Sequence, residues 1–175
     1  MRELFGLPAH PLLVHGPVAL APLVTLGLVL TVLRPSWRRP YGLIVLALAG
    51  VVFVGSVLAA SSGQELEEAL EETLGDAAND HQALGETTRL LSGVQFLLVA
   101  GWVGVGWSAD RRARETGPPA AGLAKATPVL GALGLVVSVV TLVWVIRTGH
   151  EGARLVWETG SAAVSLAGTT GGAAT

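Results

Sequence analysis

Four long apolar runs, separated by shorter polar segments, dominate the pattern of the chain. The runs cover residues 11–33, 41–60, 90–107 and 128–146. A helix needs roughly 20 apolar residues to cross a hydrocarbon core of about 30 Å, and each run is close to that length. Because a backbone in lipid must satisfy its own hydrogen bonds, the runs favour helices over open strands. The pattern therefore predicts an all-α fold, an integral membrane four-helix bundle.

The connection at 61–89 differs in character from the runs that it joins. It carries eight of the thirteen Asp and Glu residues, and both "LEEALEETLG" and "DHQALGETTRLL" favour helix. We therefore expect helices to extend past the outer membrane face here. Beyond residue 160 the chain is uncharged and rich in small residues. The pattern predicts one four-span membrane domain over residues 1–160 and a disordered tail over 161–175.

Composition and charge fix the environment and the orientation. Hydrophobic residues make up 51% of the chain and charged residues only 14%, which indicates a lipid environment. Seven of the eleven basic residues lie in the two loops that follow the first and third runs. The positive-inside rule makes these loops cytoplasmic, so both termini and the 61–89 connection lie outside the cytoplasmic membrane. With a net charge of −2, nucleic acid is not an expected partner.

All four histidines fall near the outer ends of the spans. Counting about 1.5 Å per residue from the cytoplasmic ends places them within roughly 12 Å of one another along the bundle. On the third span, His81, Thr88, Ser92 and Gln95 recur at helical spacing, so they share one face. Polar side chains in a membrane normally face the protein interior, and we expect this face to do so.

The sequence around the first two histidines suggests where the first span begins. Pro11 disfavours helical backbone at the preceding residue, which predicts an extended His10 and a helix that starts between His10 and His15. His15 then lies about one turn inside the bundle. On the fourth span, Arg147 and His150 are three residues apart and should project together.

A layer of imidazoles favours a cofactor held by nitrogen. The chain has no cysteine, which excludes iron–sulfur clusters and covalently attached c-type haem. Neutral imidazole is a good ligand for the iron of haem b and for other transition-metal ions. The predicted ligands are His10, His15, His81 and His150, and Arg89 and Arg147 are the expected partners of haem propionates.

Other interpretations remain open at this point. Each histidine could be a polar anchor or a helix cap, and both arginines could reach lipid headgroups. A hydrolase is not indicated, because "HEGAR" at 150–154 lacks the second histidine of a metalloprotease helix.

Three stretches carry a resemblance to a known family. "HPLLVHGPVAL" at 10–20, the isolated His81 after the acidic connection, and "TGHEGARLVWETG" at 148–160 together resemble the bacterial membrane family catalogued as domain of unknown function 2231. Glu151 and Ala153 depart from the more glycine-rich pattern usual around Gly152, and Trp157 replaces the commoner tyrosine. The resemblance implies a four-span membrane domain in which the four histidines are the candidate functional residues. Fusion of some members to Rieske iron–sulfur or c-type cytochrome domains implies a redox partner.

Two hypotheses follow for the function. The first is a haem b electron carrier in the lipid bilayer that exchanges electrons with a redox protein. The second is a non-redox membrane protein with a histidine-based metal site, or with a structural or transport role. A homo-oligomer is compatible with both hypotheses.

Overall fold

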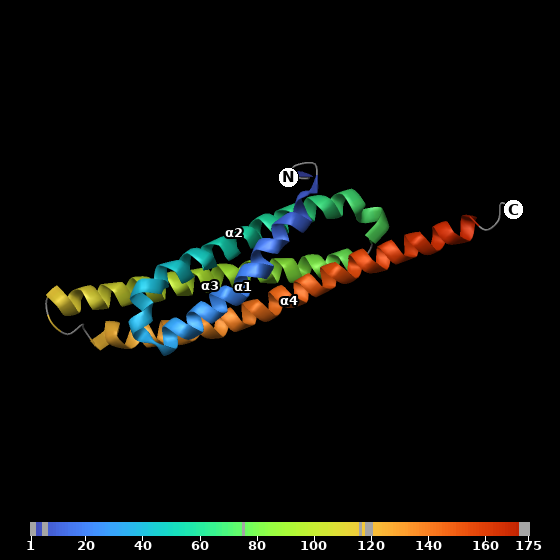
Figure 1. Ribbon diagram of the computed structural model, residues 1–175. Helices are drawn as coiled ribbons and strands as arrows, with labels where there is room; N and C mark the ends of the chain where they lie inside the picture. Colours follow the sequence, from blue (N-terminus) through green and yellow to red (C-terminus); the bar gives the residue numbers. More distant parts are fainter. Residues whose placement is uncertain (1–2, 5–6, 75, 116, 118–120, 172–175) are drawn as a thin grey trace.

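Four helices follow a short hairpin. The computed structural model describes residues 3–4, 7–74, 76–115, 117 and 121–171. The two-residue strands β1 (Glu3–Leu4) and β2 (Leu7–Pro8) pair antiparallel. The helices are α1 (Ala9–Leu33), α2 (Pro35–Leu74), α3 (Asp76–Glu115) and α4 (Ala121–Gly171), and they lie alongside one another in a bundle (Figure 1). The predicted all-α four-helix bundle is confirmed.

The helices bury a core made mostly of valine, alanine and leucine, and they also leave many apolar residues exposed on the outside. Residues such as Val24, Leu28 and Val99 are fully buried in the core. Ile44 and Leu97, in contrast, expose 56% and 68% of their surface. An apolar outer surface of this kind would be costly in water and is what lipid requires. The four helices are long and apolar enough to cross a membrane.

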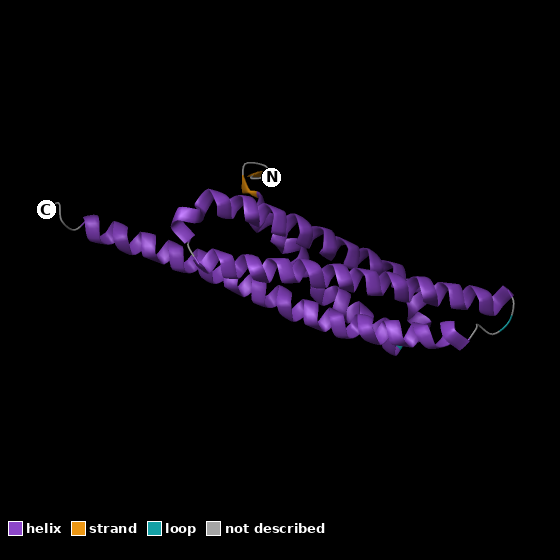
Figure 2. Ribbon diagram, turned by 180° about the vertical axis from the view of Figure 1, so that it is seen from behind, coloured by secondary structure: helices purple, strands orange, loops and turns teal. Residues whose placement is uncertain are grey.

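The bundle has two chemically different ends (Figures 1 and 2). The turn from α1 to α2 and the connection from α3 to α4 lie at one end, and the basic residues of the two predicted cytoplasmic loops lie with them. The turn from α2 to α3 and the beginning of α1 lie at the other end, together with the histidines. We call these the basic end and the histidine end.

The helices α2, α3 and α4 are longer than the apolar runs that they contain. At about 1.5 Å per residue, the 40 residues of α2 and of α3 span roughly 60 Å each, about twice a hydrocarbon core. The helix α4 continues to Gly171, past residue 160, where the sequence predicts the tail to begin. Pro128 is the one proline inside α4, so from residue 161 to 171 no ring interrupts a run rich in alanine.

The predicted start of the first helix is wrong. His10 is not extended outside the helix, because α1 begins at Ala9 and includes it. Pro11 then stands in the first turn, where backbone N–H groups have no partner within the helix and proline removes nothing. His10 therefore projects from the first turn into the bundle, at a defined rotation about the α1 axis.

Several glycines allow close helix approach, as their spacing in the second run suggests. A Cβ atom at Gly55 of α2 would lie 3.0 Å from the ring Cδ atom of Pro17 on α1. At Gly27 of α1, a Cβ atom would lie 2.8 Å from a methyl group of Val45 on α2. Both positions bring the α1 and α2 backbones nearer than side chains would allow.

Candidate functional site

Two of the four histidines meet inside the histidine end. The rings of His10 on α1 and His81 on α3 have centroids 6.0 Å apart and are nearly perpendicular, at 87°. Each of these helices packs against α2 and α4, so α1 and α3 stand diagonally across the bundle. The two imidazoles therefore meet across the bundle interior rather than along one helix pair.

The backbone of α2 orients the His10 ring. Nδ1 of His10 lies 2.9 Å from the carbonyl oxygen of Ala59 and 3.4 Å from the hydroxyl of Ser62. Since a carbonyl only accepts, Nδ1 carries the proton in this contact and Nε2 keeps its lone pair. At Gly63, a Cβ atom would come within 3.1 Å of His10 Cε1, so only glycine leaves the ring its present position.

His81 is held by packing and lacks such a bond. Its Nδ1 atom is buried and has no hydrogen-bond partner among the described residues. The ring lies against α4, where a Cβ atom at Gly152 would be 2.9 Å from His81 Cε1. The carboxylate of Glu151 and the His10 ring both act electrostatically on His81. A buried imidazole nitrogen without a partner is costly, which marks His81 as a candidate for function.

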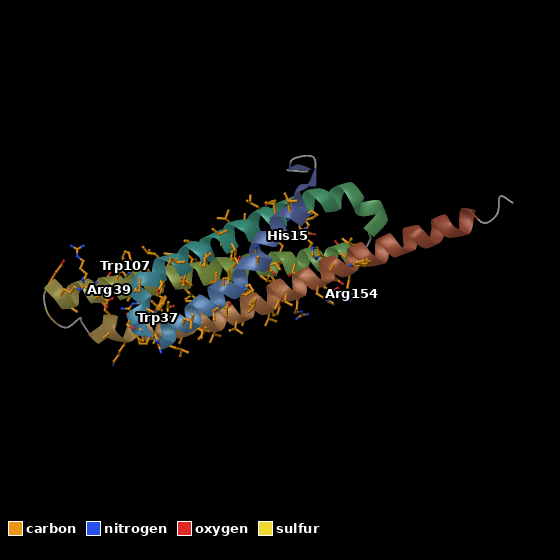
Figure 3. The ribbon with its side chains drawn as sticks, viewed as in Figure 1. His15, Trp37, Arg39, Trp107 and Arg154 are labelled. Atoms are coloured by element: carbon orange, nitrogen blue, oxygen red, sulfur yellow. The ribbon has the colours of Figure 1, made fainter. Side chains whose placement is uncertain are left out.

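The other two histidines do not join this pair. His15 is exposed on α1 (Figure 3), and its Nδ1 atom contacts the carbonyl oxygen of Pro11 in the preceding turn at 2.5 Å. His150 is exposed on α4. Across the described ranges, no three His, Asp or Glu side chains are grouped so as to hold a metal ion. The structure thus brings together His10 and His81 and leaves His15 and His150 at the surface.

Comparison with known families gives the assignment. A family described as "Predicted membrane protein (DUF2231)" matches residues 6–165, which include all four apolar runs and all four histidines. The chain belongs to this family. No curated protein and no solved structure matches the chain.

The predicted propionate partners make contacts on their own helices in this DUF2231 bundle. Arg89 forms an ion pair with Glu86, one turn earlier on α3. The guanidinium of Arg147 lies 5.2 Å from the centre of the Trp144 ring on α4, and the residue is exposed. Both arginines belong to the histidine half of the bundle, but their described contacts are with helix neighbours.

The predicted polar face of α3 is confirmed. Thr88, Ser92 and Gln95 are at most 7% exposed and face the bundle interior. Thr88 shares a hydrogen bond of 2.9 Å with Thr148 of α4. Deeper in the bundle, Gln95 donates to Ser138 of α4 at 2.7 Å, and the Ser138 hydroxyl lies 2.8 Å from that of Thr25 on α1. This network joins three helices below the histidine pair.

Sequence reasoning missed the residues that shape the histidine pair. Ser62 and Gly63 of α2 lie against the His10 ring, just after the second apolar run, and nothing in their local sequence distinguishes them from the other small residues around them. Gly152 could have been noticed in the sequence, because it follows His150 closely in the closing motif. The structure places its backbone against His81.

Proposed function

We propose that this DUF2231 protein holds a redox-active metal centre between His10 and His81 and exchanges electrons with a redox protein at the histidine end. The centre is haem b or a single transition-metal ion. The observation that carries the proposal is the pair of apposed imidazoles, one of which has a buried ring nitrogen without a hydrogen-bond partner among the described residues. Bound between two imidazoles, such a centre supplies one-electron exchange.

The spacing of the two rings supports the proposal. Two metal–nitrogen bonds of about 2.0–2.1 Å each, plus roughly 1 Å from each nitrogen to its ring centre, separate the centroids of two imidazoles on opposite sides of one metal by about 6 Å. The centroids of His10 and His81 are 6.0 Å apart. The side chains therefore already stand at a separation that shared ligation needs.

The surroundings of His10 also suit a ligand. Metal-binding histidines commonly donate the second ring N–H to a carbonyl, which fixes the tautomer and the ring orientation. The contact of His10 Nδ1 with the Ala59 carbonyl does this and leaves Nε2 for a metal. Glu151 supplies a nearby negative charge that stabilises a cationic centre.

Haem b and a single ion make different demands on the bundle. A macrocycle needs a slot between helices, and Gly63 and Gly152 leave backbone rather than side chains beside the rings. A single ion needs only the two imidazoles and further oxygen or nitrogen ligands. The position of the pair near one end of the bundle favours a redox partner there, such as the Rieske or c-type cytochrome proteins that the family resemblance implies.

An absorbance spectrum and elemental analysis of protein purified in detergent test the function. Haem b predicts a Soret band with a reduced α band, whereas a single redox-active ion predicts bound copper or iron without these bands. Bound zinc alone would fit the non-redox alternative, because zinc has no redox chemistry. A colourless protein without stoichiometric metal, after growth with added iron and haem precursor, contradicts the proposal. In that case His10 and His81 join α1 to α3 structurally, which is the non-redox alternative.

The proposed orientation gives a separate prediction. Asn79 and Ala113 are exposed near opposite ends of α3, about 51 Å apart at 1.5 Å per residue. With the histidine end outside the cytoplasmic membrane, a cysteine at position 79 should react with a membrane-impermeant thiol reagent in intact cells. A cysteine at position 113 should react only after the cells are lysed. The opposite labelling pattern would place the histidine pair in the cytoplasm.

A further inference from the structure

A cavity of about 300 Å³ lies at the basic end, far from the histidine pair. This volume is at the lower end of the roughly 300–1,000 Å³ typical of ligand pockets. All four helices contribute to its wall, which includes Thr31, Pro35, Arg38, Trp102, Thr127 and Gly131. The cavity belongs to no part of the proposed redox site, so its role must be sought in its own chemistry.

Arg38 gives this cavity a largely buried cation. Its side chain is 13% exposed, and its Nη2 atom pairs with Asp110 at 2.8 Å. The Nε atom is buried and has no partner in the described part of the chain. Gly106 permits this position, because a Cβ atom there would lie 2.6 Å from Nε. The bundle thus places a guanidinium group beside the cavity and leaves one of its N–H donors unused.

Arg39 and Trp102 also favour the binding of an anion at this end of the bundle. Arg39 also reaches Asp110, with 3.4 Å between Nε and Oδ2, so two guanidinium groups share one carboxylate. Trp102 lines the wall, and its indole nitrogen can only donate. That nitrogen sits close to α4, where a Cβ atom at Gly131 would be 2.8 Å away. The cluster of Arg38, Arg39 and Asp110 therefore carries a net positive charge. Of its members Arg38 lines the cavity, together with Trp102 and with apolar surface from Val32, Pro35 and Pro128.

The position of the cavity indicates where the anion comes from. Trp37 and Tyr41 pack edge to face at the basic end, with ring centroids 5.7 Å apart, and Trp107 lies at the same end (Figure 3). Aromatic residues of this kind mark the level of lipid headgroups. A group at that level that is anionic on one side and apolar on the other is a phospholipid.

We propose that the cavity binds a phosphate oxyanion, supplied by an anionic phospholipid, with Arg38 and Trp102 as the donors. The guanidinium fork suits phosphate because it offers several N–H groups in one plane. The apolar wall accommodates the first part of an acyl chain. Binding here would tie the beginning of α2 to α3 and α4 at the membrane boundary, independently of any cofactor at the histidine end.

Native mass spectrometry of the full chain, titrated with lipid in detergent, tests the proposal. The lipids are phosphatidylglycerol and a diacylglycerol with the same acyl chains, which lacks the phosphate. We expect wild type to bind phosphatidylglycerol at least about tenfold more tightly than diacylglycerol, since hydrogen bonds to a charged group are among the stronger ones. Arg38→Gln should remove most of this preference.

Two further variants separate the site from general attraction to the basic end and from misfolding. Arg34→Gln removes an exposed charge at the same end, one that lies over the Trp37 ring, and should retain the preference. Trp102→Phe keeps an aromatic ring but removes the N–H group, and should weaken phosphatidylglycerol binding severalfold. If Arg38→Gln and Trp102→Phe both bind as wild type does, or if Arg34→Gln loses as much as they do, the proposal is wrong.

Competition with inorganic phosphate distinguishes the two sources of the anion. Displacement of phosphatidylglycerol by millimolar phosphate would show that the free ion fills the site. Retention of the lipid under the same conditions would show that the acyl chains contribute to binding, as we propose. Equal binding of diacylglycerol and phosphatidylglycerol by wild type would overturn the phosphate site in either form.

Discussion

His81→Ala is expected to reduce the bound haem or metal to below about a tenth of the wild-type content, because it removes one of two apposed imidazoles. His10→Ala should have the same effect, since the two rings act as one site. The measurement is the absorbance spectrum together with metal content per protein. Both losses should be large, because one imidazole cannot replace the pair.

His15→Ala and His150→Ala are the matched controls. Each removes an exposed imidazole from a helix that carries or contacts the pair, α1 or α4. Both variants should keep the cofactor and the wild-type spectrum. Loss of the signal in the control variants, with retention in His10→Ala and His81→Ala, would move the site to the surface of the bundle and refute the assignment.

Gly55→Leu should strongly destabilise the bundle. A Cβ atom at this position would already lie 3.0 and 3.1 Å from two ring carbons of Pro17, and a leucine adds further carbons beyond it. The proline ring is fixed to the α1 backbone and has no rotamer by which to move away. We expect the free energy of unfolding to fall by about 3 kcal/mol, near the upper end of overpacking effects.

Gly104→Leu is the control for this change. Gly104 is an exposed glycine of α3, and a Cβ atom added there would have no neighbouring atom within 4 Å, so leucine meets only lipid or detergent. Thermal unfolding in detergent, followed by the loss of helical signal, compares the two variants. Similar midpoints for Gly55→Leu and Gly104→Leu would show that α1 and α2 do not depend on this close approach.

Local periodicity made the helices and the α3 interior predictable. Thr88, Ser92 and Gln95 follow one another at helical spacing, and in a membrane only the inward face suits polar groups. The depth of each histidine along its helix also follows from counting residues. Depth does not give the rotation of one helix against another, however. For this reason the sequence could group four histidines in one layer but could not select His10 and His81 from them.

The cavity beside Arg38 at the basic end could not be predicted from the sequence, for a different reason. Arg38 stands among basic residues whose pattern the positive-inside rule already accounts for, so no local pattern indicates that its side chain is largely buried. One residue could have been noticed in the sequence: Asp110 is a carboxylate directly before Arg111 and Arg112 in a strongly basic segment. Its partner lies 72 residues earlier on another helix, and only the folded bundle brings the two together.

The hydrogen bonds of Gln95 have a consequence for how the bundle assembles. In lipid, the apolar faces of α1, α3 and α4 are nearly interchangeable, so dispersion forces alone would allow several rotations of each helix. The amide N–H group of Gln95 donates to Ser138, which contacts Thr25, while the amide oxygen of Gln95 is buried and has no partner among the described residues. A rotation of one helix that broke this chain would leave the N–H group without its partner as well. The hydrogen bonds of this one side chain therefore fix how three helices are rotated relative to one another. The same rotations turn His10 and His81 toward each other nearer the histidine end.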